Sequence, residues 1–243
     1  MLTILASSPT RDLTEEYPVP QFDERNGFVE RLKERWQGPK RCLMIAAFPE
    51  NFPMNDEMTD YYRRAAENVG LSVACFDLWD ERWQIKGREE FLSYDVIFLA
   101  GGHIPTEMDW FRKIGLRELL EGFDGIVIGT SAGSMNAAET VYAWPEEEGE
   151  SFKTMEELFY PGLGLCRTQI VPHYQKVKDN WLDGRHMFTD ITCSHSYGKK
   201  IYAIPDGSYV WVENGVETLY GDAWLVADGE ISRFCVEGRS RQV

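Results

Sequence analysis

Five short apolar runs alternate with segments in which apolar residues recur at helical spacing. The runs are Leu2 to Ala6, Arg41 to Ala47, Leu71 to Phe76, Asp95 to Ala100 and Gly125 to Ile128. The helical stripes between them are Phe28, Leu32 and Trp36, then Met58, Tyr62, Ala65 and Val69, then Trp110, Ile114 and Leu119. Strands that alternate with amphipathic helices build βαβ units, in which neighbouring strands run parallel. The chain therefore predicts an α/β fold with an open, mostly parallel twisted sheet and helices on both faces.

The C-terminal part of the chain predicts antiparallel strands. Strand-like runs occur at Lys200 to Ile204, Ser208 to Glu213, Trp224 to Val226 and Ile231 to Val236. The dipeptide Asn214-Gly215 separates the second run from the third, and Asp228-Gly229 separates the third from the fourth. Both dipeptides are typical of hairpin turns, because their residues tolerate positive φ angles. We expect the sheet to finish with these antiparallel strands. Since no linker or repeat divides the chain, we expect residues 1–243 to form one α/β domain.

Composition excludes several classes of function. The formal net charge of -15 disfavours binding to nucleic acid or to anionic membranes, which requires a basic surface. The segment from Met1 to Ser7 lacks the basic and long apolar regions of a secretory signal, and no run is long enough to span a membrane. The five scattered cysteines include no C-x-x-C pair and predict neither disulfides nor a zinc site. We therefore expect a cytoplasmic protein.

The segment Gly129-Thr130-Ser131-Ala132-Gly133 directly follows the last of the five apolar runs. A buried strand, a G-x-S-x-G turn and a helix start match a nucleophile elbow, in which the turn presents a serine hydroxyl above the sheet. A Cβ at Gly129 or Gly133 would crowd the turn or the helix that packs on the strand. The Ala132 N–H would lie in the first helical turn, where unpaired amides stabilise an oxyanion. The simpler alternative is a tight turn that happens to contain a serine.

An activated serine needs a histidine as its base. His173 follows the strand-like run from Thr168 to Pro172 and would lie at the carboxyl edge of the sheet, where catalytic groups collect. His103 also follows a strand, but the two glycines before it favour a loop built for close backbone approach. We expect His186 to be solvated or at a helix end and His195 to be an ordinary loop histidine. His173 is therefore the preferred base.

Asp206 is the candidate for the acid that orients this histidine. It follows the run from Lys200 to Pro205 and precedes Gly207, again at the end of a strand. A Pro-Asp-Gly sequence is also common in surface turns, and that explanation suffices when Asp206 is taken alone. The order serine, histidine, acid differs from that of the α/β-hydrolases, in which the acid precedes the histidine. A different fold is expected accordingly.

Four motifs occur along the chain in a fixed order, namely Leu99-Ala100-Gly101-Gly102, Gly129-Thr130-Ser131-Ala132-Gly133, Val171-Pro172-His173-Tyr174 and Ile204-Pro205-Asp206-Gly207. With them, the chain resembles the peptidase E and cyanophycinase family of serine peptidases, from about Thr3 to Val212. The resemblance implies a flavodoxin-like, class I glutamine amidotransferase-like fold. It also implies that the nucleophile is Ser131, the base His173 and the acid Asp206, and that the oxyanion hole is formed by the amides of Gly102 and Ala132.

The chain departs from the family pattern beside these groups. Ala100 replaces a third glycine, His103 an asparagine, Thr130 a tryptophan and Asp206 a glutamate. Gly101, His103 and Thr130 are candidates for substrate binding. The resemblance implies a serine peptidase that hydrolyses short peptides through an acyl-enzyme, as a dipeptidase or isopeptidase with a preference for an N-terminal acidic residue. No metal or cofactor is needed for this chemistry, and the partner is a small peptide.

Two alternatives remain for the function, and the sequence leaves open whether the chain forms a homo-oligomer. The first is an esterase or amidase that acts on a non-peptide substrate, and the second is an inactive binding module on the same fold. An acidic substrate would need local cations, for which Arg112, Lys176, Lys178 and Arg185 are candidates. The acidic segment from Trp144 to Glu150 is typical of a solvated loop and could also border the active site.

Overall fold

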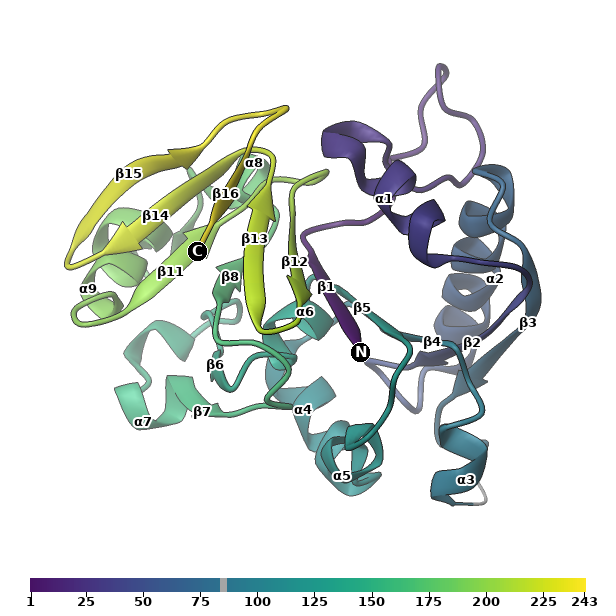
Figure 1. The fold of residues 1–243 in the computed structure, drawn as a ribbon. Helices are drawn as coiled ribbons and strands as arrows, with labels where there is room; N and C mark the ends of the chain where they lie inside the picture. Colours follow the sequence, from purple (N-terminus) through teal and green to yellow (C-terminus); the bar gives the residue numbers. More distant parts are fainter. Residues whose placement is uncertain (84–86) are drawn as a thin grey trace.

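The computed structural model describes residues 1–83 and 87–243. In this part of the chain the main sheet has eight strands, in the order β16-β13-β12-β1-β5-β4-β2-β3 (Figure 1). Its parallel strands are β1 (Leu2–Ala6), β2 (Lys40–Ile45), β3 (Val73–Trp79), β4 (Val96–Leu99) and β5 (Ile126–Thr130). Its antiparallel strands are β12 (Tyr209–Glu213), β13 (Val216–Tyr220) and β16 (Ser240–Gln242). Each of the five predicted runs overlaps one parallel strand, so the predicted mostly parallel sheet is confirmed.

Helices cover both faces of this sheet, because successive strand residues point to opposite sides. In β4, Phe98 packs in a cluster with Phe28 and Tyr62, whereas Leu99 packs in a second cluster with Phe111. The helices of the first face are α1 (Phe28–Arg35) and α2 (Phe52–Asn68). Those that contribute to the second cluster are α3 (Arg88–Phe91), α4 (Ile104–Lys113), α5 (Leu116–Leu120) and α6 (Ala132–Asn136). The predicted helices on both faces are therefore confirmed.

The third predicted helical stripe is divided between α4 and α5. Gly115 separates the two helices with a φ of 63°, a left-handed conformation that favours glycine. Its N–H donates to the carbonyl of Arg112, 3.1 Å away, at the end of α4. A single helix through Trp110, Ile114 and Leu119 is therefore wrong, because the chain turns at this glycine.

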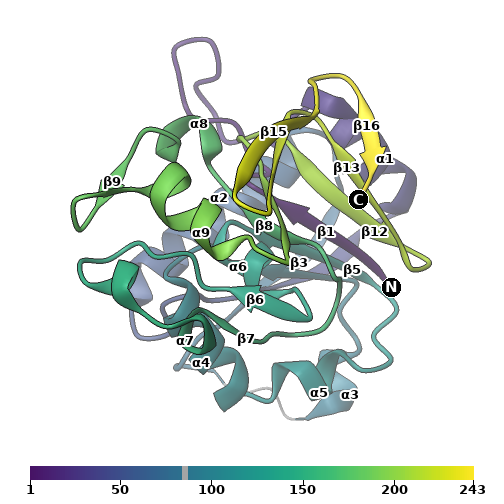
Figure 2. The same cartoon turned by 90° about the vertical axis from the view of Figure 1, so that its left-hand side faces the viewer.

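The C-terminal strands do not all extend the main sheet, which corrects the sequence prediction. A second sheet has the order β15-β14-β11-β8. Its strands are β8 (Gln169–Val171), β11 (Lys200–Ala203), β14 (Ala223–Ala227) and β15 (Glu230–Cys235). Figure 2 shows this sheet in front of the main one. The two sheets share an apolar core, in which Val127 and Ile170 belong to one cluster. Strand-like runs specify a strand, but they do not specify which strand it pairs with.

Both predicted hairpins are present. Asn214 and Gly215 join β12 to β13 with φ angles of 51° and 75°, although the second strand of this hairpin, Val216–Tyr220, lies outside the predicted runs. Asp228 and Gly229 join β14 to β15 with φ angles of 48° and 84°. Two successive positive φ angles are the requirement of the type I′ turn, which matches the twist of the paired strands.

The segment between α6 and β11 contains, besides β8, a series of small elements. These are β6 (Thr140–Tyr142), the 3-10 turn Glu150–Phe152, α7 (Met155–Leu158), β7 (Phe159–Pro161), α8 (Tyr174–Val177), β9 (Trp181–Leu182), β10 (Arg185–His186), the π-helix Met187–Thr192 and α9 (Cys193–His195). A further 3-10 turn, Arg25–Gly27, precedes α1. No helix in residues 1–83 or 87–243 combines the length and the apolar character needed to cross a membrane.

Two predictions about histidines have different outcomes here. His186 lies at the start of the π-helix, where its Nδ1 accepts from the N–H groups of Phe188 and Thr189, so the expected helix-end position is confirmed. His195 is not a loop histidine, because it ends α9, is buried, and places Nδ1 2.9 Å from the Tyr142 hydroxyl. Its burial depends on a partner 53 positions away, which local sequence does not reveal.

Candidate active site

Ser131 lies at the sharp turn between β5 and α6. Its φ of 50° and ψ of -115° are a combination that residues with a side chain rarely adopt. The turn is held because the Ser131 N–H donates to the carbonyls of Ala6 and Ser7, each 3.1 Å away, at the end of β1. The observed arrangement is thus a buried strand, a strained serine and a helix start, in that order.

The two glycines of the turn are sterically required. A Cβ on Gly129 would lie 2.7 Å from the Cα of Ser134. A Cβ on Gly133 would lie 2.5 Å from the carbonyl oxygens of Leu99 and Ala100. Real Cβ atoms do not approach backbone this closely. The expected crowding at both positions is confirmed, and it keeps α6 packed against the carboxyl end of β4.

The structure brings Ser131, His173 and Asp206 together in one chain of hydrogen bonds. The His173 Nε2 lies 3.0 Å from the Ser131 Oγ, and the His173 Nδ1 lies 2.6 Å from the Asp206 Oδ1. His173 follows β8 and Asp206 follows β11, and these two strands pair in parallel in the second sheet. The site therefore lies between the two sheets, and the expected single sheet edge is wrong in this respect.

The carboxylate of Asp206 is surrounded by donors. Its Oδ1 accepts from the Ser7 hydroxyl at 2.7 Å, and its Oδ2 accepts from Gln175 Nε2 at 2.6 Å and from Lys176 Nζ at 2.9 Å. Burial raises the pKa of Asp206, but the hydrogen bonds from His173, Lys176 and Ser7 outweigh it and hold the pKa below its ordinary value. Asp206 is therefore a carboxylate, so that Nδ1 of His173 donates to it and Nε2 is left to accept from Ser131.

The glycine-rich loop after β4 lies beside Ser131. A Cβ on Gly101 would lie 3.2 Å from the Ser131 Cβ, and one on Gly102 would lie 2.8 Å from the Phe48 ring. Ala132 is the first residue of α6, so its N–H has no acceptor within the helix. The loop and the start of α6 thus lie next to the serine, as a pair of oxyanion donors at Gly102 and Ala132 would require.

The other two candidates for substrate binding lie in different surroundings. Thr130 is 8% exposed, and its Oγ1 lies 3.0 Å from the Tyr62 hydroxyl, so its side chain is engaged in the interior. His103 precedes α4, with Nδ1 2.8 Å from the Thr106 hydroxyl and Nε2 3.6 Å from Glu150 Oε1. Of these two side chains, that of His103 lies beside the acidic segment from Trp144 to Glu150, through its contact with Glu150.

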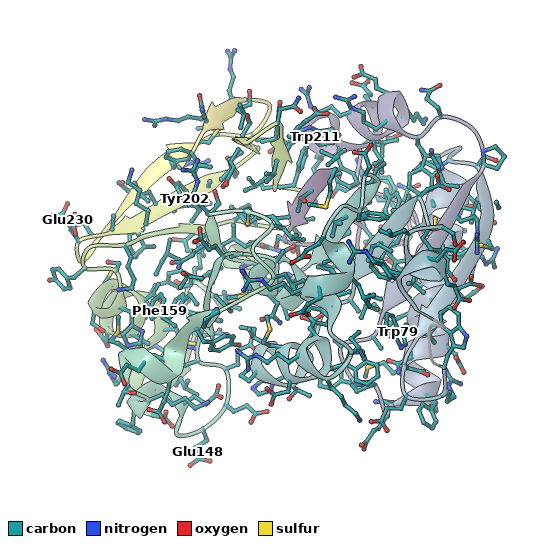
Figure 3. All side chains as sticks on the ribbon, turned by 60° about the horizontal axis from the view of Figure 1, so that its bottom comes forward. Trp79, Glu148, Phe159, Tyr202, Trp211 and Glu230 are labelled. Carbon is teal, nitrogen blue, oxygen red and sulfur yellow. The ribbon has the colours of Figure 1, made fainter. Side chains whose placement is uncertain are left out.

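The acidic segment borders the site. The pKa of Glu146 is raised to about 7, first by desolvation of the Glu146 carboxyl and then by the negative charge of the nearby Glu150. The proximity of His173 opposes this rise. Glu148 projects outward at the edge of the molecule, as expected for a solvated loop (Figure 3). Glu150 departs from that expectation, because it is buried and accepts from Lys153 Nζ at 2.5 Å and from two backbone N–H groups.

Within residues 1–83 and 87–243, His103, Glu147 and Glu150 form the group that could hold a cation. One potential ligand atom from each lies within 4.8 Å of the others. The charge of the Glu150 carboxylate is already balanced by Lys153. Burial raises the pKa of Glu150, but the hydrogen bonds from Lys153 and from the backbone N–H groups of Glu146 and Glu147 outweigh it and lower the pKa to about 2. These contacts account for its burial without a metal ion.

The four candidate cations are occupied by neighbouring groups. Lys176 contacts Asp12 and Asp206, Lys178 contacts Asp179, Arg112 contacts Asp109, and Arg185 donates to the carbonyls of Ser151 and Asp190. Each contact lowers the positive potential that the cation offers to an acidic substrate.

Sequence reasoning missed Ser7 and Gln175, which both contact Asp206. Ser7 follows β1 directly, at the carboxyl end of a central parallel strand. The rule that selects His173, a polar residue directly after a strand, also selects Ser7. Gln175 carries no comparable signal, since its contact depends on the turn of the chain into α8.

Three comparisons relate this chain to known proteins. The model of peptidase family S51 matches residues 53–219. A crystal structure of a peptidase from an acI-B1 Actinobacterium is 16% identical with a TM-score of 0.60, over 100% of this chain and 96% of that chain. A candidate peptidase E protein from Listeria monocytogenes EGD-e is 16% identical with a TM-score of 0.58, over 96% of this chain and 98% of that chain. The comparison with curated proteins gives no match.

The two structural matches establish the fold, which is the α/β fold of these peptidases. The family match covers more than half of the chain and includes Ser131, His173 and Asp206. The chain therefore belongs to peptidase family S51, and the protein is a serine hydrolase.

Proposed function

We propose that this enzyme hydrolyses short peptides with Ser131 as nucleophile, His173 as general base and Asp206 as orienting acid. The observation that carries the proposal is the continuous chain of hydrogen bonds through these three side chains, with separations of 3.0 Å and 2.6 Å. These separations lie within the range at which a base can accept the proton of a nucleophile. The strained backbone at Ser131 adds support, since strain of this kind clusters at active sites.

The reaction proceeds by acyl transfer. The Ser131 oxygen attacks the peptide carbonyl while its proton moves to Nε2 of His173, and the carbonyl oxygen becomes an oxyanion. The N–H groups of Gly102 and Ala132 stabilise that oxyanion. The C–N bond then breaks, and the imidazolium gives its proton to the leaving amine. Water repeats the sequence on the acyl-enzyme and releases the acid, so that Ser131 and His173 return to their starting state.

Charge beside the glycine loop bears on which peptides are cleaved. A pocket of about 570 Å³ is lined by Phe48, Pro49, Glu50, Asn51, Pro53 and Thr106. Phe48 packs on Gly102 and Thr106 contacts His103, so the pocket adjoins the loop. Among the described residues that line it, Glu50 is the ionisable one. An acidic side chain would face this carboxylate, whereas an uncharged one would pack on Phe48. We therefore infer, against the acidic preference that the family resemblance implies, that dipeptides with an uncharged N-terminal side chain are cleaved faster than those with an N-terminal aspartate.

A dipeptide library measured against matched esters tests the proposal. We expect hydrolysis of dipeptides, with Phe-X ahead of Asp-X. We expect the substitution Ser131→Ala to lower kcat by about 10⁴-fold or more. Hydrolysis of esters with every dipeptide left intact would instead favour an esterase or amidase. An alanine variant as active as the unmodified enzyme would refute the role of Ser131.

A further inference from the structure

The three side chains of the proposed triad come from separate segments that a single residue, Ser7, holds together. Ser7 follows β1 and is fully buried, with 0% of its surface exposed. Its carbonyl accepts from the Ser131 N–H at 3.1 Å, and its N–H donates to the Ser208 carbonyl at 3.3 Å. Its hydroxyl contacts both His173 and Asp206. Each of the three segments is thus hydrogen-bonded to Ser7. The segment that carries Asp206 is bonded at two points, the Asp206 carboxylate and the Ser208 carbonyl.

The directions of the two hydroxyl contacts follow from their partners. The backbone N–H of His173 can only donate, so the Ser7 Oγ accepts from it at 2.7 Å. The Asp206 carboxylate can only accept, so the Ser7 hydroxyl donates to Oδ1 at 2.7 Å. Oδ1 is also the atom that accepts from His173 Nδ1. The Ser7 hydroxyl therefore acts both as a donor, to Asp206, and as an acceptor, from the His173 N–H.

This contact links the two sheets at the site. Ser7 and Ser131 extend from neighbouring strands of the main sheet, whereas His173 and Asp206 follow strands of the second sheet. The distance between the Ser131 Oγ and the His173 ring therefore depends on how the sheets are aligned. His173 has a φ of 56°, which residues with a side chain rarely adopt, and its N–H is fixed by the Ser7 hydroxyl.

From these contacts we propose that Ser7 is a positioning residue, whose hydroxyl aligns the His173 ring and the Asp206 carboxylate with Ser131. This inference rests on the proposed function, since it assumes that the three residues act together. Ser7 acts through its two neighbours, because its hydroxyl bonds to the His173 N–H and to the Asp206 carboxylate. Its donated hydrogen bond also stabilises the negative charge of Asp206.

The test uses Ser7→Ala, Ser7→Cys and a matched control in the full-length protein. Cysteine is close in size to serine but is a weak donor and acceptor, so it removes the hydrogen bonds with little change in packing. Ser196 provides the control, because it is also 0% exposed and its hydroxyl likewise donates to a carbonyl, that of Cys193, and accepts an N–H, that of Gly229. Ser196→Ala therefore removes an equivalent buried pair of hydrogen bonds outside the proposed triad.

The readout is the second-order rate constant for labelling of Ser131 by a fluorophosphonate, measured across pH. This probe needs no knowledge of the substrate side chain. We expect Ser7→Ala and Ser7→Cys to slow labelling by about 10- to 100-fold, the range for hydrogen bonds to a charged group. We also expect the acidic limb of the pH profile to move to higher pH, because an Asp206 carboxylate with one donor fewer holds the protonated imidazole more tightly. Ser196→Ala should lower the melting temperature with the labelling rate and the pH profile unchanged.

The outcomes separate this inference from the proposed function. An unmodified enzyme that is folded but never labelled at Ser131 would refute the proposed function itself. If the unmodified enzyme is labelled and the two Ser7 variants are labelled equally fast, Ser7 has no positioning role. Slower labelling that Ser196→Ala reproduces, with no shift of the pH profile, would reduce Ser7 to a general contribution to stability.

Discussion

Replacement of Asp206 by asparagine tests how the histidine is oriented. Both carboxylate oxygens accept from donors only, with Ser7 and His173 at Oδ1 and with Gln175 and Lys176 at Oδ2. An asparagine amide has one acceptor oxygen and an NH2 group in place of the other. Because the Lys176 ammonium cannot accept, we expect the amide oxygen to remain beside Lys176 and the NH2 group to face His173.

This orientation reverses the tautomer of His173. With an NH2 group opposite, Nδ1 becomes the acceptor and Nε2 carries the hydrogen, so Nε2 can no longer take the proton of Ser131. The variant also loses the charge that stabilises the imidazolium. We expect kcat/KM for a cleaved dipeptide to fall by about 10⁴-fold, which corresponds to about 5.4 kcal/mol of transition-state stabilisation.

A second substitution makes the reasoning refutable. Lys176→Gln in the Asp206→Asn background removes the ammonium that fixes the amide, so the amide oxygen can turn to His173 and activity should rise above that of Asp206→Asn alone. Lys176→Gln by itself serves as the control. Asp206→Asn with more than one-tenth of the unmodified kcat/KM, in a protein that melts as a folded chain, would exclude Asp206 as the orienting acid.

Three further substitutions test the packing and charges around the site. Gly133→Ala places a Cβ 2.5 Å from two carbonyl oxygens at the end of β4. It should lower the free energy of unfolding by about 1–3 kcal/mol, which corresponds to a fall in Tm of roughly 2–12 °C, and should also lower kcat. An unchanged melting curve would contradict the steric argument. Burial raises the pKa of Glu107 well above its ordinary value, although the hydrogen bond from Asn136 opposes the rise. Because Glu107 binds its proton more tightly in the folded protein, the stability that this proton contributes is lost as pH rises from 4.5, the pKa in the unfolded chain, toward the pKa in the folded protein. Urea unfolding should therefore show Glu107→Gln gaining stability over the unmodified protein by up to about 1.4 kcal/mol per pH unit above pH 4.5, and a pH-independent difference would refute a buried, neutral carboxyl. The proximity of His173 lowers the pKa of Glu146, so His173→Ala should raise the pKa of Glu146 above about 7 in an NMR titration, and a lower pKa would contradict their proximity.

The residues that sequence reasoning identified correctly share one property, which is that their role is set by local backbone geometry. Gly129 has to be glycine because a Cβ there would meet Ser134, five positions along the chain, and Asn214-Gly215 specifies a hairpin within its own four positions. The position of His173 near a strand end is likewise a local feature, since only Pro172 separates it from β8. Such features depend on neighbours in the sequence, and a single chain contains that information.

The residues that it placed wrongly or missed depend on distant partners. Ser7 is bonded to His173 across 166 positions, and Glu150 is buried although its local sequence is acidic and typical of a solvated loop. The assignment of β8 and β11 to a second sheet is likewise set by tertiary packing, since a short apolar run pairs with any compatible strand edge. Sequence periodicity therefore predicted the strands but not the surface between the sheets, where the site lies.

The most direct measurement of the central claim is the position and stoichiometry of a fluorophosphonate label, read by mass spectrometry of the digested protein. The hydrogen bonds among Ser131, His173 and Asp206 predict one label per chain, attached to Ser131, with labelling abolished by His173→Ala in a chain that still folds. A label on a different serine, or an enzyme that hydrolyses peptides while Ser131 stays unmodified, would contradict the account.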